Sequence, residues 1–398
     1  MYDDSYWKRG LGRNRRVMAF VRFLMKGYLR RRFGIGRNEY IPHEEPFLLL
    51  GNHVSDWDPF IEALIIPRYM RFVATEHLIK SRPLGPIIRF LINPIPRRKA
   101  ASADDTVEYI RRNLGLGINV AMFPEGVRTL NGRTGYVSPR TGELVKSASG
   151  SLITCRLSGG YLCDPVWASE KRKGEARCEI VAEYSREQLD KMTVDEINEV
   201  INRDLFVDVF EDQRGLHCRY SCDSPAAGLE NALYICPECC GIGTMRGTGN
   251  TFSCRCGYSV RINDYGFFEG EPAVFDNIAD WDVWQRDYVA SHRSEWLVSP
   301  GHVLCCQSGI TLSEAGGKKA NVLLSGADMQ LYPDRIVFES ASESKCFELS
   351  AITRMSNHRS ISLLFSAGEK YYEASSDSEW PVYRYVEMYR LLTGKPCK

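Results

Sequence analysis

The sequence contains no run of about 18 or more uncharged apolar residues, which is the length that a membrane-spanning helix requires. It also shows no secretory signal peptide, because its first apolar stretch follows a long basic segment and is itself interrupted by charged residues. We therefore expect neither a membrane-spanning helix nor secretion.

Net charge is almost absent, +1 over 398 residues, but the charges are unevenly distributed. Residues 1–37 hold eleven lysine or arginine residues and only two acidic ones, a local charge of +9, so the remainder carries about −8. Within this arm, residues 13–35 place apolar side chains near the helical period and basic ones at most other positions. We expect a basic amphipathic helix in an anionic membrane interface, on the cytoplasmic face, which would make the protein a peripheral membrane protein.

A surface helix packed on its own domain is the alternative for this arm. A nucleic-acid partner is not expected, because no nucleic-acid-binding fold is recognisable.

The length of 398 residues exceeds one ordinary hydrophobic core and predicts several domains. Composition is that of a globular protein, with 44% hydrophobic and 25% charged residues. The fourteen cysteines indicate a reducing compartment, because several are isolated in apolar stretches and four have metal-ligand spacing. The expected domains are a basic helix (1–37), an α/β domain (38–215), a zinc ribbon (228–270), a helical linker (271–299) and a mainly β domain (300–398).

Strand and helix patterns alternate over residues 40–210, which predicts a central, mostly parallel sheet flanked by helices. The predicted strands are 47–50, 71–74, 118–123 and 161–169, and the predicted helices are 84–92, 102–114, 144–158 and 193–211.

A histidine and an aspartate follow the first of these strands, in the stretch Phe47–Asp58. His53 and Asp58 have the spacing H-x-x-x-x-D, which suits a general base and the carboxylate that orients it. A structural hydrogen-bonded pair is the alternative for both residues, and a helix cap is an alternative for Asp56 or Asp58.

Charged side chains also follow two other predicted strands. Pro124-Glu125-Gly126 ends the strand 118–123, and Arg97 and Arg98 end the strand-like segment INPIPRRKA. Open α/β sheets bind ligands at the carboxyl ends of their strands, so the Glu125 carboxylate is a candidate for a binding site.

Four cysteines form two close pairs, Cys236 with Cys239 and Cys254 with Cys256, and fourteen residues lie between the pairs. Two such pairs joined by a glycine-rich hairpin can direct four thiolates at one tetrahedral Zn²⁺. We expect a structural zinc ribbon, because four thiolates leave no open position for water. The second pair is spaced C-x-C rather than C-x-x-C, so Cys240, Cys218 and Cys222 are alternative ligands.

The last hundred residues alternate in short runs that predict antiparallel strands, followed by a helix rich in aromatic residues. This pattern resembles a pleckstrin-homology (PH) or GRAM-like domain. A further helix is predicted at 273–290, where Trp281, Trp284 and Tyr288 have helical spacing.

Four blocks now occur in order: NHVSDWD (52–58), PIPRRK (94–99), FPEGVRT (123–129) and an apolar segment containing Pro165. Together they resemble the glycerolipid acyltransferase family, whose best-known members are 1-acylglycerol-3-phosphate O-acyltransferases. The resemblance covers about residues 15–210, roughly half of the chain.

The resemblance implies that His53 is the general base that deprotonates a glycerol hydroxyl, and that Asp58 orients and charges this histidine. It also implies an arginine for the acceptor phosphate, for which Arg98 is the better match and Arg97 the next. The second block departs from the family pattern, because it lacks the usual glycine and acidic residue before its arginine.

In the third block, the resemblance places Glu125 and Gly126 in the acceptor site, and Arg128 stands where the family usually has arginine. The implied enzyme is a transferase of phospholipid biosynthesis that moves an acyl group from acyl-CoA or acyl-carrier protein to a lysophospholipid. Lysophosphatidate is the simplest acceptor. Glycerol-3-phosphate or another lysolipid is an alternative acceptor, and a non-catalytic lipid-binding scaffold is an alternative function.

Overall fold

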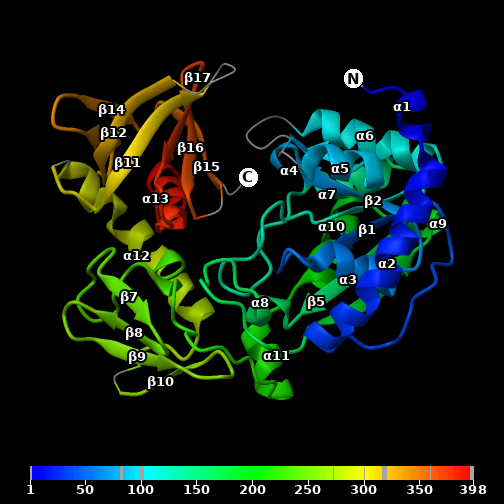
Figure 1. The fold of residues 1–398 in the computed structure, drawn as a ribbon, viewed down its shortest axis with the longest axis horizontal. Coiled ribbons are helices and arrows are strands. Elements are labelled where there is room, and N and C mark those ends of the chain that lie inside the picture. The colour runs from blue at the N-terminus through cyan, green and yellow to red at the C-terminus, as the bar shows by residue number, and fades with distance from the viewer. Residues whose placement is uncertain are drawn as a thin grey trace. The chain divides into compact units, whose positions relative to one another are not determined.

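The computed structural model describes residues 2–80, 84–97, 103–271, 273–299, 301–315, 321–358 and 360–394. The chain divides into two compact units (Figure 1). The first contains Met1–Val166 and Lys171–Cys222, and the second contains Trp167–Glu170 and Asp223–Lys398.

Within the described residues, the first unit is built on a six-stranded sheet in the order β3-β2-β4-β1-β5-β6. The five strands β1–β5 are parallel to their neighbours and the edge strand β6 is antiparallel, which confirms the mostly parallel sheet. The strands are β1 (Phe47–Gly51), β2 (Met70–Thr75), β3 (Ile95–Arg97), β4 (Asn119–Met122), β5 (Ser151–Ser158) and β6 (Arg177–Tyr184).

Helices flank this sheet (Figure 1). They are α1 (Asp4–Lys8), α2 (Leu11–Phe33), α3 (Asp58–Ile65), α4 (Glu76–Lys80), α5 (Leu84–Ile92), α6 (Asp104–Gly115), α7 (Arg140–Ser147), α8 (Gly160–Cys163), α9 (Arg186–Lys191), α10 (Val194–Leu205) and α11 (Val209–Leu216). Side chains of α6, α7 and α10 share a core with Leu48 and Leu50 of β1, and Trp7 of α1 joins this core. The basic helix α2 packs against α3 and α5.

The predicted helix 144–158 and the predicted strand 161–169 are wrong. α7 ends at Ser147, and Gly150, at φ +109°, leads into β5, which is almost wholly buried beside β1. A continuous apolar run does not distinguish a buried strand from a buried helix, which is why the pattern over 151–158 predicts the wrong element. Residues 160–163 then form the short helix α8, after a glycine in the left-handed region at position 159.

The second unit combines a small four-stranded antiparallel sheet, one long helix, and a larger antiparallel sheet. The described strands of the larger sheet number seven, in the order β14-β13-β12-β11-β17-β16-β15. The elements are a 3-10 turn (Leu229–Asn231), β7 (Met245–Thr248), β8 (Thr251–Cys254), β9 (Ser259–Ile262), β10 (Phe268–Glu269), α12 (Ile278–Val298), β11 (Cys305–Ala315), β12 (Asn321–Leu331), β13 (Arg335–Glu339), β14 (Ser344–Glu348), β15 (Ile352–His358), β16 (Ser362–Ala367), β17 (Lys370–Ser375) and α13 (Val382–Thr393).

Antiparallel strands followed by a C-terminal helix are thus confirmed, whereas the likeness to a PH or GRAM-like domain stays a prediction. One hydrophobic core joins the large sheet, α13, Val289 of α12 and the segment Tyr234–Ile235. The indole nitrogen of Trp281 donates to the Ile235 carbonyl at 2.9 Å, so α12 holds the segment that leads into Cys236.

No helix in the described parts of the chain is long and apolar enough to cross a membrane.

Candidate active site

The loop that carries His53 begins where β1 ends, at Gly51, and closes where α3 begins, at Asp58. Only glycine fits at position 51, because a Cβ there would lie 2.2 Å from Oε1 of Glu62 and 2.9 Å from Sγ of Cys155. Gly51 thus allows β1 to end in contact with Glu62 and Cys155, and the chain then leaves the sheet and enters the loop.

His53 and Asp58 are directly hydrogen-bonded, with 2.8 Å between Nδ1 and Oδ2. The Asp58 side chain is fully buried and also accepts the N–H groups of Val54 (2.7 Å) and Ser55 (2.8 Å) and the hydroxyl of Ser55 (2.5 Å). A carboxylate that accepts so many donors favours the N–H on Nδ1 of His53, which leaves Nε2 able to accept a proton. The two residues therefore have the geometry of a base and its orienter.

The helix-cap alternatives do not hold for this loop. Trp57 is the N-cap residue of α3, with no side-chain cap, and the Asp58 oxygens bond to residues before the helix rather than to its first turn. Asp56 is 75% exposed and lies 3.6 Å from Nε of Arg128 in an ion pair.

Glu125 holds the main chain of His53. Its Oε1 accepts the N–H of His53 at 2.7 Å, and its Oε2 accepts the N–H of Gly135 at 2.5 Å. The contact forms because β4, which leads to Glu125, pairs in parallel with β1, so both loops leave the same edge of the sheet. Burial raises the pKa of Glu125 to about 7, although the two backbone donors oppose that shift.

The same loop contributes two further contacts to His53. The N–H of Thr129 donates to the His53 carbonyl at 2.9 Å, so both backbone polar groups of the histidine are held. Its imidazole stacks on Phe123, with 4.3 Å between ring centroids and 14° between the planes. The ring remains 21% exposed, which leaves it accessible to a substrate.

Of the two arginines predicted for the acceptor phosphate, only Arg97 belongs to the described residues. Arg97 ends β3, which is separated from β1 by β2 and β4, so its backbone lies roughly 14 Å away along the same sheet edge. Arg98 lies outside the described residues. Gly126 adopts the left-handed region at φ +71°, where a side chain would be strained, and Arg128 pairs with Asp56. Acceptor binding by these residues, and by Glu125, stays a prediction.

Two residues that contact the His53–Asp58 dyad, and one that lies next to His53 in the chain, were missed as site residues. Ser55 donates to Asp58, Phe123 stacks on His53, and Asn52 ties the end of β1 to β5. All three lie inside the quoted blocks, so the signal was present, but their partners become visible only in three dimensions.

A further acid, Glu62, is buried in α3. Glu62 is one helical turn beyond Asp58 and is 1% exposed. Its Oε1 accepts the thiol of Cys155 at 3.2 Å, and its Oε2 has no hydrogen-bond partner among the described residues. Burial, and then the neighbouring Cys178 and Asp58, raise the pKa of Glu62 well above its ordinary value, although the hydrogen bond from Cys155 opposes that shift.

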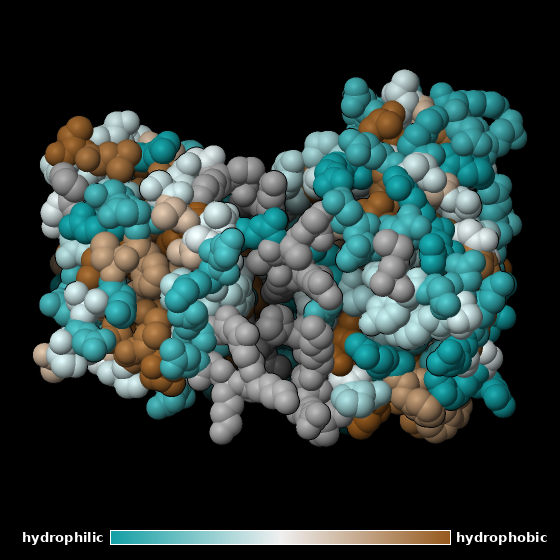
Figure 2. Space-filling model, turned by 90° about the horizontal axis from the view of Figure 1, so that it is seen from above, coloured by the Kyte–Doolittle hydropathy of each residue, from teal (hydrophilic) through white to brown (hydrophobic). Residues whose placement is uncertain are grey.

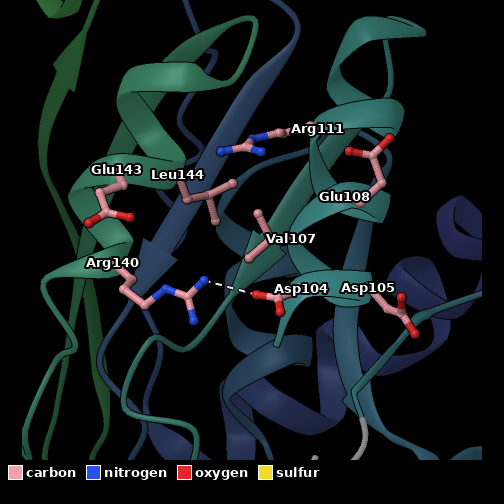
Figure 3. A pocket seen from close by; sticks show the side chains of 8 residues that line it. All are labelled: Asp104, Asp105, Val107, Glu108, Arg111, Arg140, Glu143 and Leu144. Carbon is pink, nitrogen blue, oxygen red and sulfur yellow. Dashed lines mark hydrogen bonds and ion pairs between the residues drawn. The ribbon is translucent and has the colours of Figure 1, made fainter. Parts of the chain in front are cut away.

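A cavity of about 360 Å³ lies between α6 and α7 (Figure 3). It is lined mostly by charged side chains, and Arg140 pairs with Asp104 at 2.9 Å across it. Neither His53 nor Glu125 contributes to its lining, so it is not the site of the dyad.

The four predicted cysteines converge in the second unit. The Sγ atoms of Cys236, Cys239, Cys254 and Cys256 all lie within 4.8 Å of one another, with 3.8 Å between Cys236 and Cys256 and 3.7 Å between Cys239 and Cys254. A tetrahedral zinc ion with Zn–S bonds of about 2.3 Å requires about 3.8 Å between sulfurs. The donor set and spacing therefore fit zinc, and the alternatives Cys240, Cys218 and Cys222 are not in the cluster.

Comparison with known proteins gives a family match for the part of the chain that contains His53 and Asp58. Residues 32–158 match the family model described as "Acyltransferase". This segment is an acyltransferase-family domain. It contains the first three of the four blocks, and within it His53 is hydrogen-bonded both to Asp58 and to Glu125. Among curated proteins, none matches the sequence.

Three solved structures are similar to parts of the chain. The 1-acyl-sn-glycerophosphate (LPA) acyltransferase PlsC from Thermotoga maritima is 18% identical, and the match covers 52% of this chain and 81% of that one, with a TM-score of 0.40. The N-terminal PH domain of Vps36 (16% identity, 23% and 80% coverage, TM-score 0.20) and that of human ARAP2 (10%, 23% and 81%, 0.18) are also similar. All three TM-scores lie below 0.5, so the family assignment rests on the sequence match.

Proposed function

We propose that the protein is an O-acyltransferase that moves a fatty acyl group from an acyl thioester to the free hydroxyl of a lysophospholipid, most simply converting lysophosphatidate to phosphatidate. The observation that carries the proposal is the partly exposed His53 bonded to the buried Asp58 within an acyltransferase-family domain. The donor is acyl-CoA or acyl-carrier protein.

The proposed reaction follows from the dyad. Nε2 of His53 accepts the proton of the acceptor hydroxyl, while the hydroxyl oxygen attacks the thioester carbonyl. Collapse of the tetrahedral intermediate breaks the C–S bond, and the imidazolium returns its proton to the leaving thiolate. Asp58 stabilises the imidazolium in between, because its carboxylate lies 2.8 Å from Nδ1 and is shielded from water. A thioester is already activated, so no covalent enzyme intermediate is needed.

For the acceptor phosphate, we propose the arginines of the second and third sequence blocks. A guanidinium can bind a phosphate through two parallel hydrogen bonds, which favours Arg98, with Arg97 next. Arg128 is the third candidate, since it lies in the loop that also contacts His53.

We also propose that α2 binds an anionic membrane surface. Three of its large apolar side chains are more than half exposed, Phe20 (61%), Phe23 (74%) and Leu24 (57%), and its residues include no acid. On the face drawn in Figure 2, hydrophobic residues form separate surface patches among hydrophilic ones. Apolar side chains flanked by arginine suit insertion among lipid heads.

The cysteine cluster is proposed to hold structural Zn²⁺. It would supply folding energy to a hairpin too small for a core of its own, and it takes no part in acyl transfer.

The test of the proposed function is acyl transfer from labelled acyl-CoA and acyl-carrier protein to a panel of acceptors: lysophosphatidate, glycerol-3-phosphate and lysolipids with other head groups. We expect transfer to lysophosphatidate that His53→Ala abolishes. Binding to vesicles without turnover on any acceptor would favour the lipid-binding scaffold instead.

The membrane proposal is tested by flotation with anionic liposomes. Deleting the whole arm is a poor test, because Trp7 is fully buried in the core of the first unit. We expect Phe23→Ser to weaken binding, whereas Val298→Ser, a matched change at a side chain that is 81% exposed on α12, leaves it unchanged. Equal binding by both variants would contradict the proposal.

A further inference from the structure

Asn52, the residue before the catalytic histidine, is buried and makes two hydrogen bonds to one residue of the neighbouring strand. Its Nδ2 donates to the carbonyl of Leu157 at 2.9 Å, and its Oδ1 accepts the N–H of Leu157 at 2.7 Å. Only 1% of Asn52 is exposed, so both bonds are shielded from water.

These bonds continue the sheet beyond the end of its ladder. The last backbone pair between β1 and β5 is Gly51 with Cys155. A side-chain amide offers one acceptor and a donor, as a peptide group does, so Asn52 takes the place of the next strand residue. Its own main chain is therefore released from the sheet and can turn, while the position at which it turns stays fixed to β5.

The turn places His53 between two anchors. Asn52 fastens the preceding residue to β5 through its side chain, on one flank of β1. On the other flank, which β4 occupies, Glu125 holds the His53 N–H and Thr129 holds its carbonyl. The imidazole thus projects from a backbone held on both flanks, with its ring orientation set by Asp58.

We propose that Asn52 is a positioning residue for the acyl transfer, which sets the place of the His53 imidazole without contacting substrate. The inference rests on the proposed function, because it assumes that His53 is the base. A base displaced by about 1 Å can lose on the order of 100-fold in rate, so loss of the amide should lower kcat while leaving KM nearly unchanged.

The chain offers a matched control at the opposite end of β1. Asn119 is also buried, accepts the N–H of Phe47 at 3.1 Å and donates to the Tyr69 carbonyl at 3.0 Å. It lies at the start of β4 and links the start of β1 to the residue before β2, at the opposite end of β1 from the loop that carries His53. A purely structural role for Asn52 therefore predicts the same outcome for both asparagines.

The experiment compares Asn52→Ala, Asn119→Ala and His53→Ala in the full chain, by thermal unfolding and by kcat and KM for lysophosphatidate. Asn52→Ser, whose hydroxyl can serve one of the two Leu157 groups, replaces the alanine variant if that variant does not fold. We expect similar losses of melting temperature at both asparagines, but a fall in kcat on the order of 10- to 100-fold only at Asn52.

Equal kcat for the two asparagine variants, with an inactive His53→Ala, would overturn the positioning role and leave the proposed function intact. A fully active His53→Ala would overturn both, because no base would then remain to be positioned.

Discussion

Replacing Asp58 with asparagine would remove one negative charge from the loop that carries His53 while preserving its hydrogen bonds. Oδ2 of Asp58 accepts three donors, from His53, Val54 and Ser55, and an amide oxygen placed there can accept the same three. The amide nitrogen would face the Ser55 hydroxyl, which can rotate to accept instead of donate. We therefore expect Asp58→Asn to fold normally and to keep the proton on Nδ1 of His53.

The loss should appear in the transition state, where the imidazole becomes positively charged. Two unit charges about 4 Å apart interact by about 4 kcal/mol at an effective dielectric constant of about 20. If the imidazolium is between half and fully formed, the barrier rises by about 2–4 kcal/mol, which is roughly 30- to 1,000-fold in kcat.

The assay is the steady-state rate of acyl transfer to lysophosphatidate, beside thermal unfolding to establish that the variant is folded. Asp56→Asn is the matched control, because Asp56 lies in the same loop but is 75% exposed and does not contact His53 among its described contacts. A folded Asp58→Asn enzyme within a factor of about three of the wild-type kcat would refute the role assigned to this carboxylate.

Three further predictions concern Glu62, Glu125 and the four-cysteine cluster. The raised pKa of Glu62 means that folding of the wild type binds a proton, so the wild type should lose stability as pH rises from about 5 to 8. Glu62→Gln removes this loss and should therefore become progressively more stable than wild type over the same range. Urea unfolding that gives the same stability difference between the two proteins at both pH values would contradict this. Glu125→Gln leaves either the His53 or the Gly135 N–H without an acceptor oxygen, so kcat should fall about tenfold with little change in KM. An unchanged kcat would contradict the role of Glu125 in holding the His53 backbone. Chelation should release one zinc per chain and increase hydrogen exchange in β7 and β8 and also in β11. The effect should reach β11 because Tyr234–Ile235, beside Cys236, belongs to the core of the large sheet. Exchange that rises only in β7 and β8 would show that the cysteine cluster and the large sheet are not coupled.

The meeting of His53, Asp58 and Glu125 follows from features that a sequence displays. Both loops come after apolar strands, and in a parallel sheet the carboxyl ends of neighbouring strands share one edge. The order of the blocks then specified which strand ends carry the site.

The hydrogen-bond partners could not be predicted in the same way. Glu125 contacts the backbone of His53 and of Gly135, and Asn52 bonds to Leu157 over a hundred positions along the chain. Such bonds depend on which strand neighbours β1, and the neighbour β5 was itself expected to be a helix. Glu62 was equally hidden, since nothing in its local pattern indicates that this face of α3 is sealed against β1 and Cys155.

The most direct test of the central claim is the rate of acyl transfer from acyl-CoA to lysophosphatidate by folded His53→Ala enzyme, measured beside wild type at saturating substrate. General-base catalysis contributes typically about 100- to 10,000-fold, so the variant should be slower by at least about 100-fold at an unchanged melting temperature. A folded variant that transfers acyl groups at the wild-type rate would contradict the assignment of His53 as the base.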